Sequence, residues 1–176
     1  MTVVLVPIWI FREYDRCSGC RYCEIACSLK HEGIIWPEAS RVRVFEYVPG
    51  ITIPIICSQC TDYPCVQACP TKALYVDETT GAVRVDEGKC IKCGKCVEVC
   101  PGRIPRILPQ KDSVIICDLC GGDPECVKVC RALGFNALVV VDKWPGTHYK
   151  LYARDAEKIT RDYVKKLYKV DPEEVM

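Results

Sequence analysis

The chain has 176 residues, 16 of them cysteine, and a formal net charge of +1. This length suits one domain that buries its own core, and the composition gives no reason to expect a nucleic-acid partner. Cysteine at about a tenth of the residues is a level usually met in small secreted chains that are stapled by disulfides. The chemistry of these thiols is therefore the first property to explain.

The first expected element is the apolar run at residues 3–11. The run is short, no basic residue precedes it, and the polar residues 12–15 follow it without a small-residue cleavage site. These features favour a buried strand over a signal peptide. No other segment has the length needed to span a bilayer, so we predict a cytoplasmic protein without direct membrane insertion.

The sixteen cysteines fall into four groups of four. The first and third groups share the spacing C-x2-C-x2-C-x3-C, and the second and fourth have a longer insertion before their third cysteine. In chain order the groups are Cys17, Cys20, Cys23 and Cys27; Cys57, Cys60, Cys65 and Cys69; Cys90, Cys93, Cys96 and Cys100; and Cys117, Cys120, Cys126 and Cys130.

This spacing favours one of three chemistries. Three cysteines at three-residue intervals reach three iron corners of a cubane cluster from a single loop. Four thiols crowded into one short window disfavour a disulfide framework. Structural zinc sites usually take two C-x2-C pairs that a longer stretch separates. We therefore predict four 4Fe-4S clusters with all sixteen cysteines as ligands, and disulfides or zinc are the alternatives.

The central elements are two short strands at residues 73–77 and 82–86, joined by a turn at Gly81. With the flanking cysteines they make a unit over residues 57–101 that resembles a bacterial dicluster ferredoxin, down to the proline after Cys69 and Cys100. The resemblance implies that each fourth cysteine serves the neighbouring cluster. The implied ligand sets are Cys57, Cys60, Cys65 and Cys100; Cys90, Cys93, Cys96 and Cys69; Cys17, Cys20, Cys23 and Cys130; and Cys117, Cys120, Cys126 and Cys27.

Further hairpins are expected at residues 41–53 and 137–152, on either side of the central unit. The first and fourth cysteine groups also lie outside that unit, so we expect them to pair as a second module. The predicted fold is α+β, with two dicluster-ferredoxin-like modules, one inserted in the other. The outer module would comprise residues 1–49 and 111–176, and the inner module residues 50–110.

The last expected element is an amphipathic helix at residues 155–170, with apolar residues at three- and four-residue intervals. We expect it to pack on its own domain rather than on a partner.

Several other side chains attract attention but complete no catalytic constellation. The count of cysteine ligands is complete without His31, so we expect a hydrogen-bonding or surface role for it. His148 is expected in solvent, and the three tryptophans in the core or at an interface. Basic residues near the cysteines are expected to offset cluster charge: Arg21, Lys72, Lys89, Lys92, Lys95, Arg103 and Arg106.

The alternation of short and expanded cysteine groups over residues 8–142 resembles the four-cluster subunits of molybdenum and tungsten pterin enzymes, such as the dimethyl sulfoxide reductase family. Residues 17–33, with Pro37 and residues 40–44, are similar to the small subunits of tungsten aldehyde oxidoreductases. The resemblance implies a non-catalytic electron-transfer subunit. Its partners would be a larger tungsten or molybdenum pterin subunit, acting on an aldehyde, and a soluble ferredoxin or further redox subunit.

Three other functions stay open on the sequence. They are the iron-sulfur subunit of a dimethyl sulfoxide reductase-type enzyme, a free polyferredoxin without a dedicated partner, and a zinc-stabilised binding module. A colourless zinc protein without acid-labile sulfide would identify the last of these.

Overall fold

The computed structural model describes residues 7–143 and 152–176. Within these ranges the strands form three separate two-stranded antiparallel sheets. Each sheet is small, and helices contact all three sheets.

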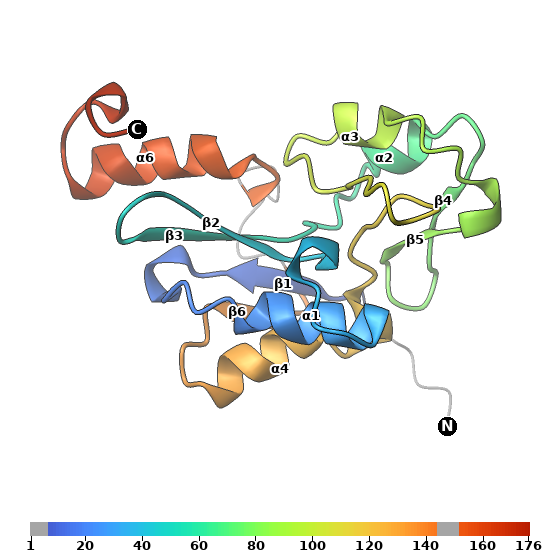
Figure 1. Cartoon of the computed structure of the whole chain (residues 1–176), viewed down its shortest axis with the longest axis horizontal. Helices are drawn as coiled ribbons and strands as arrows, with labels where there is room; N and C mark the ends of the chain where they lie inside the picture. The colour runs from blue at the N-terminus through green and yellow to red at the C-terminus, as the bar shows by residue number, and fades with distance from the viewer. Residues whose placement is uncertain (1–6, 144–151) are drawn as a thin grey trace.

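Two segments far apart in the sequence build the first part of the fold. Strand β1 (Trp9–Arg12) pairs with β6 (Leu138–Val141). Helix α1 (Tyr22–Glu32) packs on α4 (Glu125–Ala132), and α4 also contacts β6. Figure 1 shows the two helices side by side below β1. Both helices carry cysteines, so their packing positions two cysteine groups.

A hairpin crosses the middle of the molecule. Strand β2 (Arg43–Val48) pairs with β3 (Ile51–Ile55), and Gly50 takes a φ of 82° in the turn, which glycine adopts without strain. Helix α6 (Ala156–Leu167) packs on β3 and β2 and lies above them in Figure 1. Asp155 caps this helix by accepting the backbone N–H of its third residue.

The third part is the central segment, at the right of Figure 1. Strand β4 (Leu74–Val76) pairs with β5 (Val83–Val85). Helix α2 (Pro64–Gln67) contacts β4 and α3 (Lys95–Glu98), and both of these one-turn helices begin directly before a cysteine.

Short 3-10 helices join these elements. They are η1 (Tyr14–Arg16), η2 (Pro37–Ala39), η3 (Glu87–Lys89), η4 (Leu119–Gly122) and η5 (Pro172–Glu174).

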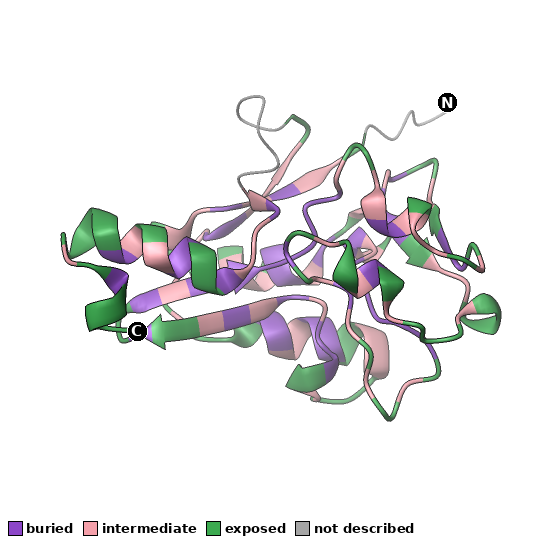
Figure 2. Cartoon of the chain, turned by 90° about the horizontal axis from the view of Figure 1, so that it is seen from above, coloured by how far each residue is buried: buried purple, intermediate pink, exposed green. Residues whose placement is uncertain are grey.

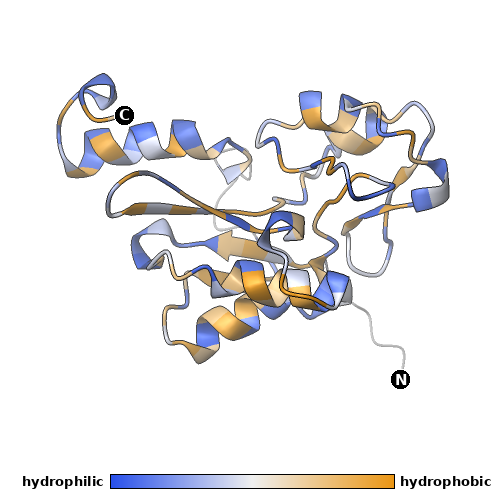
Figure 3. Cartoon of the chain, viewed as in Figure 1, coloured by the Kyte–Doolittle hydropathy of each residue, from blue (hydrophilic) through white to orange (hydrophobic). Residues whose placement is uncertain are grey.

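The core consists of two clusters of buried side chains. The larger one mixes aliphatic residues such as Ile10, Ile56 and Val83 with buried cysteines. The smaller one joins hairpin β2–β3 to α6 through residues such as Ile53 and Val164. The buried segments in Figure 2 run through the strands and the inner helix faces, and α6 alternates hydrophilic and hydrophobic bands in Figure 3.

Most elements that the sequence predicts are present. The hairpin at residues 41–53, the central strand pair and the C-terminal helix are confirmed, and α6 packs within the chain. Its buried apolar residues are Ala156, Ile159 and Val164, with Tyr163 and Val170 packed beside them, whereas Leu167 is exposed. The expected module boundary between residues 49 and 50 falls in the turn of hairpin β2–β3.

One strand pairing was not predicted. Strand β6 pairs with β1, and the hairpin expected between residues 137–141 and 149–152 stays a prediction. Of that expected partner only Tyr152 lies within the described residues, and Trp144 and His148 lie outside them, as do residues 3–6 of the expected first strand. The pairing was missed because it joins opposite ends of the chain.

Candidate metal centres

All sixteen cysteines lie in the described part of the chain, and every one is a free thiol. Two of them, Cys20 and Cys93, are exposed. The buried ones are Cys23, Cys27, Cys57, Cys65, Cys96, Cys117 and Cys126. Buried cysteines in this number, with no disulfide among them, indicate that their sulfur atoms bind another group.

Four cysteines line one apolar cavity between β3, α2 and the segment that follows α3. Cys57, Cys60 and Cys65 come from the second cysteine group, and Cys100 comes from the third. Apolar side chains such as Ile116 complete the lining. The structure therefore brings the last cysteine of one group to the first three of its neighbour, as the ferredoxin resemblance implies.

A second cavity shows the reciprocal arrangement. Cys90, Cys93 and Cys96 line it together with Cys69, the last cysteine of the second group. Burial raises the pKa of Cys96, and negative charge on Cys90, Cys93 and Cys69 raises it further. Leu74 and other apolar side chains close the cavity. Both central sets therefore contain the four thiols that one cubane cluster requires.

The packing of α1 on α4 brings a third set together. Burial raises the pKa of Cys126, and the neighbouring thiols Cys27 and Cys120 raise it further. The pKa of Cys117 is raised in the same way by burial and then by several thiols that include Cys126 and Cys27. Cys27 on α1 therefore lies among three cysteines of the fourth group.

The remaining set is joined only in part. The charges of Cys17 and Cys20 act on Cys23, whose pKa burial raises to about 12. Cys130 lies on the last turn of α4, where its Sγ accepts the N–H of Ala137 at 3.2 Å. No interaction described for these residues links Cys130 to the other three, so its place in this set stays a prediction.

The last cysteine of every group shares one further feature, which is a backbone N–H donated to its sulfur. Amides that donate to a cluster sulfur stabilise its negative charge and help to set the reduction potential. The donors and N···S distances are Arg41 to Cys27 at 3.2 Å, Ala73 to Cys69 at 3.2 Å, Ile104 to Cys100 at 3.4 Å, and Ala137 to Cys130 at 3.2 Å.

Burial makes these thiols hard to ionise. It raises the pKa of Cys60 to about 11, of Cys65 to about 12 and of Cys96 to about 11, and it raises the pKa of Cys57 further. A soft metal centre must therefore supply the favourable energy that converts these thiols to thiolates.

One charged residue at these sites was missed in the sequence. Arg12 is 1% exposed, and the charges of Cys57 and Cys60 both act on its guanidinium. Its Nη1 donates to the carbonyl of Ile56 at 2.5 Å and its Nη2 to the hydroxyl of Ser58 at 2.8 Å. Strand periodicity was the available signal, because Arg12 shares the buried face of β1 with Ile10.

Gln59 was also missed. Its side-chain amide donates to the carbonyl of Cys117 at 2.8 Å and accepts the N–H of Val83 at 3.0 Å. One buried side chain thus ties the loop of the second cysteine group to that of the fourth. Neither contact leaves a sequence signal, because both partners are backbone groups.

The basic residues expected to offset cluster charge have mixed positions. Arg106 fits best, since it is half-buried and lies close enough to Cys27 for the two charges to interact. Lys89 and Lys95 are instead exposed and pair with Asp86 and Glu98. These two lysines are therefore solvated surface groups.

His31 has a hydrogen-bonding position beside the third set. Its Nε2 lies 3.6 Å from Sγ of Cys120 and 3.5 Å from Oδ1 of Asp118. Asp118 also accepts the backbone N–H of Cys120. This position agrees with the hydrogen-bonding role expected for His31.

No helix within residues 7–143 and 152–176 is long and apolar enough to cross a bilayer.

The residues present fit the group that their spacing suggests. Soft thiols select iron-sulfur clusters or zinc, and the two central cavities each hold four of them among apolar side chains. With sixteen cysteines the donor set fits four 4Fe-4S clusters. The fold and these sites define an iron-sulfur protein of ferredoxin-like type.

Comparison with known proteins gives the family. Residues 48–139, more than half of the chain, match the model of the 4Fe-4S dicluster domain. The chain therefore belongs to the 4Fe-4S dicluster domain family.

Three curated relatives illustrate where such chains occur. The chain is 57% identical over 164 residues to the polyferredoxin-like subunit of aliphatic sulfonate oxidoreductase from Pyrococcus furiosus, covering 93% of this chain and 95% of the relative. It is 36% identical to the thiosulfate reductase electron transfer subunit PhsB of Salmonella typhi, covering 78% and 80%. It is 34% identical to one of the polypeptides of the anaerobic dimethyl sulfoxide reductase of Escherichia coli, covering 73% and 72%.

Proposed function

We propose that this chain is the electron-transfer subunit of a multisubunit oxidoreductase and relays electrons through four 4Fe-4S clusters. The single observation that carries this proposal is the gathering of cysteines from different groups into shared sites. The family and the names of the three relatives support it. Catalysis on a substrate would belong to another subunit.

The proposed ligand sets follow from the cavities and the neighbouring thiols. Each central set lines a cavity. In the third set the thiols lie close enough for their charges to interact. In the fourth set Cys17, Cys20 and Cys23 interact in the same way, and Cys130 is added by analogy with ferredoxins. The sets are Cys57, Cys60, Cys65 and Cys100; Cys90, Cys93, Cys96 and Cys69; Cys117, Cys120, Cys126 and Cys27; and Cys17, Cys20, Cys23 and Cys130.

The neighbours of these sets suggest a linear relay. The charge of Cys57 acts on Cys117, and that of Cys23 acts on Cys126, so the set with Cys117 lies between those with Cys57 and Cys23. The remaining set lies beside the Cys57 set through the contact of α2 with α3. Each end set contains an exposed cysteine, Cys93 at one end and Cys20 at the other. Electrons would enter and leave at these ends.

The chain's own residues would do three things for the relay. Bound clusters supply one-electron redox chemistry over a wide range of potentials. Apolar side chains around the central sites exclude water, the amides at each group's last cysteine stabilise the sulfur charge, and Arg12 adds a fixed positive charge.

We further propose the two-module arrangement. The sheet β1–β6 with the pair α1–α4 would form the outer module over residues 1–49 and 111–176. The sheet β4–β5 with α2 and α3 would form the inner module over residues 50–110. Apart from hairpin β2–β3 and α6, each grouping has one two-stranded sheet and two helices, which supports descent of both from one repeated unit.

The proposed partner is a larger subunit with a tungsten or molybdenum pterin, and electrons would pass to a soluble ferredoxin or a further redox subunit in the cytoplasm. The segment at residues 17–33 supports an aldehyde as the substrate of that partner. The name of the Pyrococcus furiosus relative supports an aliphatic sulfonate as a second candidate.

Anaerobic purification of the native protein tests the proposal. We expect about sixteen irons and about sixteen sulfides per chain, and a co-eluting larger polypeptide that contains tungsten or molybdenum. Assay of that complex with aldehydes and with aliphatic sulfonates separates the two substrates. A loaded chain that always elutes alone would indicate a free polyferredoxin, and a colourless zinc protein would refute the whole proposal.

A further inference from the structure

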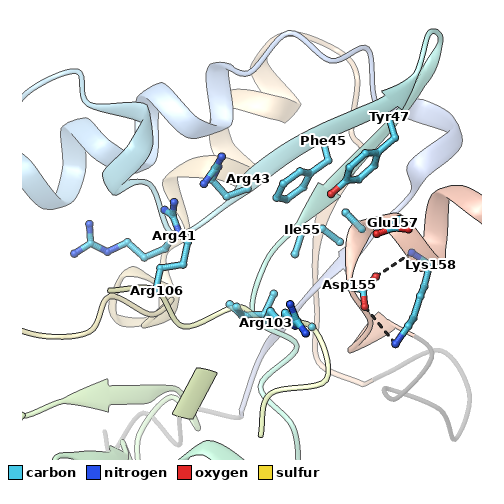
Figure 4. Close-up of a pocket in the computed structure, with 13 residues that line it drawn as sticks. Arg41, Arg43, Phe45, Tyr47, Ile55, Arg103, Arg106, Asp155, Glu157 and Lys158 are labelled. Carbon is cyan, nitrogen blue, oxygen red and sulfur yellow. Dashed lines mark hydrogen bonds and ion pairs between the residues drawn. The ribbon is translucent and has the colours of Figure 1, made fainter. Parts of the chain in front are cut away.

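A pocket lined by basic residues lies between hairpin β2–β3, the segment after Cys100 and the start of α6 (Figure 4). Its lining includes five basic side chains and two acidic ones. The basic ones are Arg41, Arg43, Arg103, Arg106 and Lys158, and the acidic ones are Asp155 and Glu157. Of these residues the sequence predicted a role only for Arg103 and Arg106, which were expected to offset cluster charge, and the proposed relay does not use the pocket itself.

Two of the arginines share their carboxylates with other cations. Arg41 pairs with Glu32, which also pairs with Lys111 at 2.9 Å. In the same way Arg43 lies 3.8 Å from the buried Glu24, which also pairs with Arg21. Each carboxylate thus faces two positive charges, so the arginine side of the pocket keeps an excess of positive charge.

The other two arginines increase this excess. Arg106 donates to the carbonyl of Ser40, a neutral group. Burial lowers the pKa of Arg106 to about 10, and the nearby cations Arg43 and Arg41 lower it further against the opposing charge of Glu24. Arg103 is exposed, and within the described residues only its backbone N–H is bonded, not its guanidinium. It is free to meet a carboxylate.

The acidic residues of the pocket do not neutralise the positive charge of these arginines. Asp155 pairs with Lys158 at 3.4 Å and caps α6, and Glu157 pairs with Arg161 at 3.0 Å. Figure 4 shows Asp155, Glu157 and Lys158 at the start of α6, across the pocket from the arginines near β2. The carboxylates that belong to the pocket are therefore already engaged.

Two aromatic rings give the pocket an apolar surface on which side chains of a protein partner can pack. The rings of Phe45 and Tyr47 stack with centroids 5.9 Å apart, and Arg43 lies over the Phe45 ring. Tyr47 is 46% exposed. Arginine and aromatic side chains together are typical of the residues that dominate protein interfaces, and arginine binds carboxylates through two parallel hydrogen bonds.

We propose that this pocket docks an acidic segment of a protein partner, with its Asp or Glu carboxylates against Arg103, Arg106 and Arg43 and its apolar side chains on Phe45 and Tyr47. The inference deepens the proposed function and rests on it for the existence of a partner.

The pocket also lies next to two of the proposed metal centres. Gly102 and Ile104 line both this pocket and the cavity that holds Cys100. Arg41 donates its backbone N–H to the sulfur of Cys27. A docked acidic segment would add negative charge beside these sites and lower the reduction potential of the nearby clusters.

A labelled hexaglutamate peptide tests the pocket on the full, anaerobically loaded chain. We expect binding that weakens as salt is added, that falls about tenfold in Arg103→Glu, and that is largely kept in Arg103→Lys. Lys165→Glu is the matched control, because it makes the same change of charge on α6 outside the pocket. That variant should bind as the native chain does.

The iron and sulfide content of each variant separates the two proposals. A chain that cannot be loaded contradicts the proposed function, whereas a fully loaded chain that does not bind the peptide contradicts only the pocket. Equal losses in Arg103→Glu and Lys165→Glu would show a general charge effect and overturn the site. Displacement of the peptide by inorganic phosphate at equal concentration would mark a small-anion site and overturn protein docking.

Discussion

Arg12 and Cys57 lie together in the core, with the buried guanidinium bonded to the residues on both sides of the cysteine. The charge of Cys57 is among those that act on Arg12. A fixed positive charge at this position favours the more negative, reduced form of any cluster that Cys57 holds.

Arg12→Met should therefore lower the reduction potential of the centre at Cys57, Cys60, Cys65 and Cys100, and Arg12→Lys should lower it less. An anaerobic redox titration followed by electron paramagnetic resonance measures the change. Arg161→Gln is the control, because Arg161 is on α6 and its ion pairs among the described residues are with the exposed carboxylates of Glu157 and Glu173. Unchanged potentials in a fully loaded Arg12→Met chain would contradict the assignment.

The contact of His31 with Cys120 gives a second prediction. His31→Ala should keep about sixteen irons per chain but lower the potential of one centre, because the thiolate loses a nearby N–H donor. His31→Gln keeps a donor and should shift the potential less. Iron analysis is the discriminating measurement, since a loss of about four irons would make His31 a ligand.

Glycine in the first cysteine loop gives a third. Gly19 has a φ of 72°, and a Cβ there would lie 2.8 Å from Cγ2 of Thr52. Gly94 has a φ of 80° in the third loop, with open space around it. Each alanine variant pays about 1–2 kcal/mol for the left-handed backbone, but only Gly19→Ala adds a steric clash.

We expect Gly19→Ala to lose more iron and to unfold at a lower temperature than Gly94→Ala. Iron content and the thermal midpoint of the loaded chains provide the comparison. Equal behaviour of the two variants would show that the contact with Thr52 does not constrain the loop.

The raised thiol pKa values give a fourth prediction, for the metal-free chain. Folding raises the pKa of Cys60 to about 11 and of Cys65 to about 12, from 9.0. Stability from the neutral thiols is therefore complete below pH 9 and is lost as the pH rises through these folded values. The loaded chain should lack this loss, because iron already holds the thiolates.

Denaturant midpoints of the metal-free and loaded chains at about pH 8 and about pH 10.5 check this expectation. The loaded chain is the matched control, since it contains the same lysines and tyrosines. A parallel fall in both midpoints would place the effect on those residues rather than on the thiols.

Much of the site could be predicted from the sequence, because it depends on local geometry of the chain. Three-residue spacing of Cys90, Cys93 and Cys96 depends only on the geometry of one loop, and the glycine turn between β4 and β5 likewise needs few residues. The ferredoxin resemblance implied that Cys100 joins the second group and Cys69 the third, and these cysteines line the corresponding cavities.

By itself the sequence determined the thiol donors, their grouping into fours and the cofactor that this number fits, because ligand spacing within a loop is a local property of the chain. Only the tertiary structure decided the pairing of β1 with β6, the burial of Arg12 beside Cys57 and the meeting of Arg43, Arg103 and Arg106 in one pocket. Those contacts join residues distant in sequence, and packing of the whole chain selects them rather than any local preference.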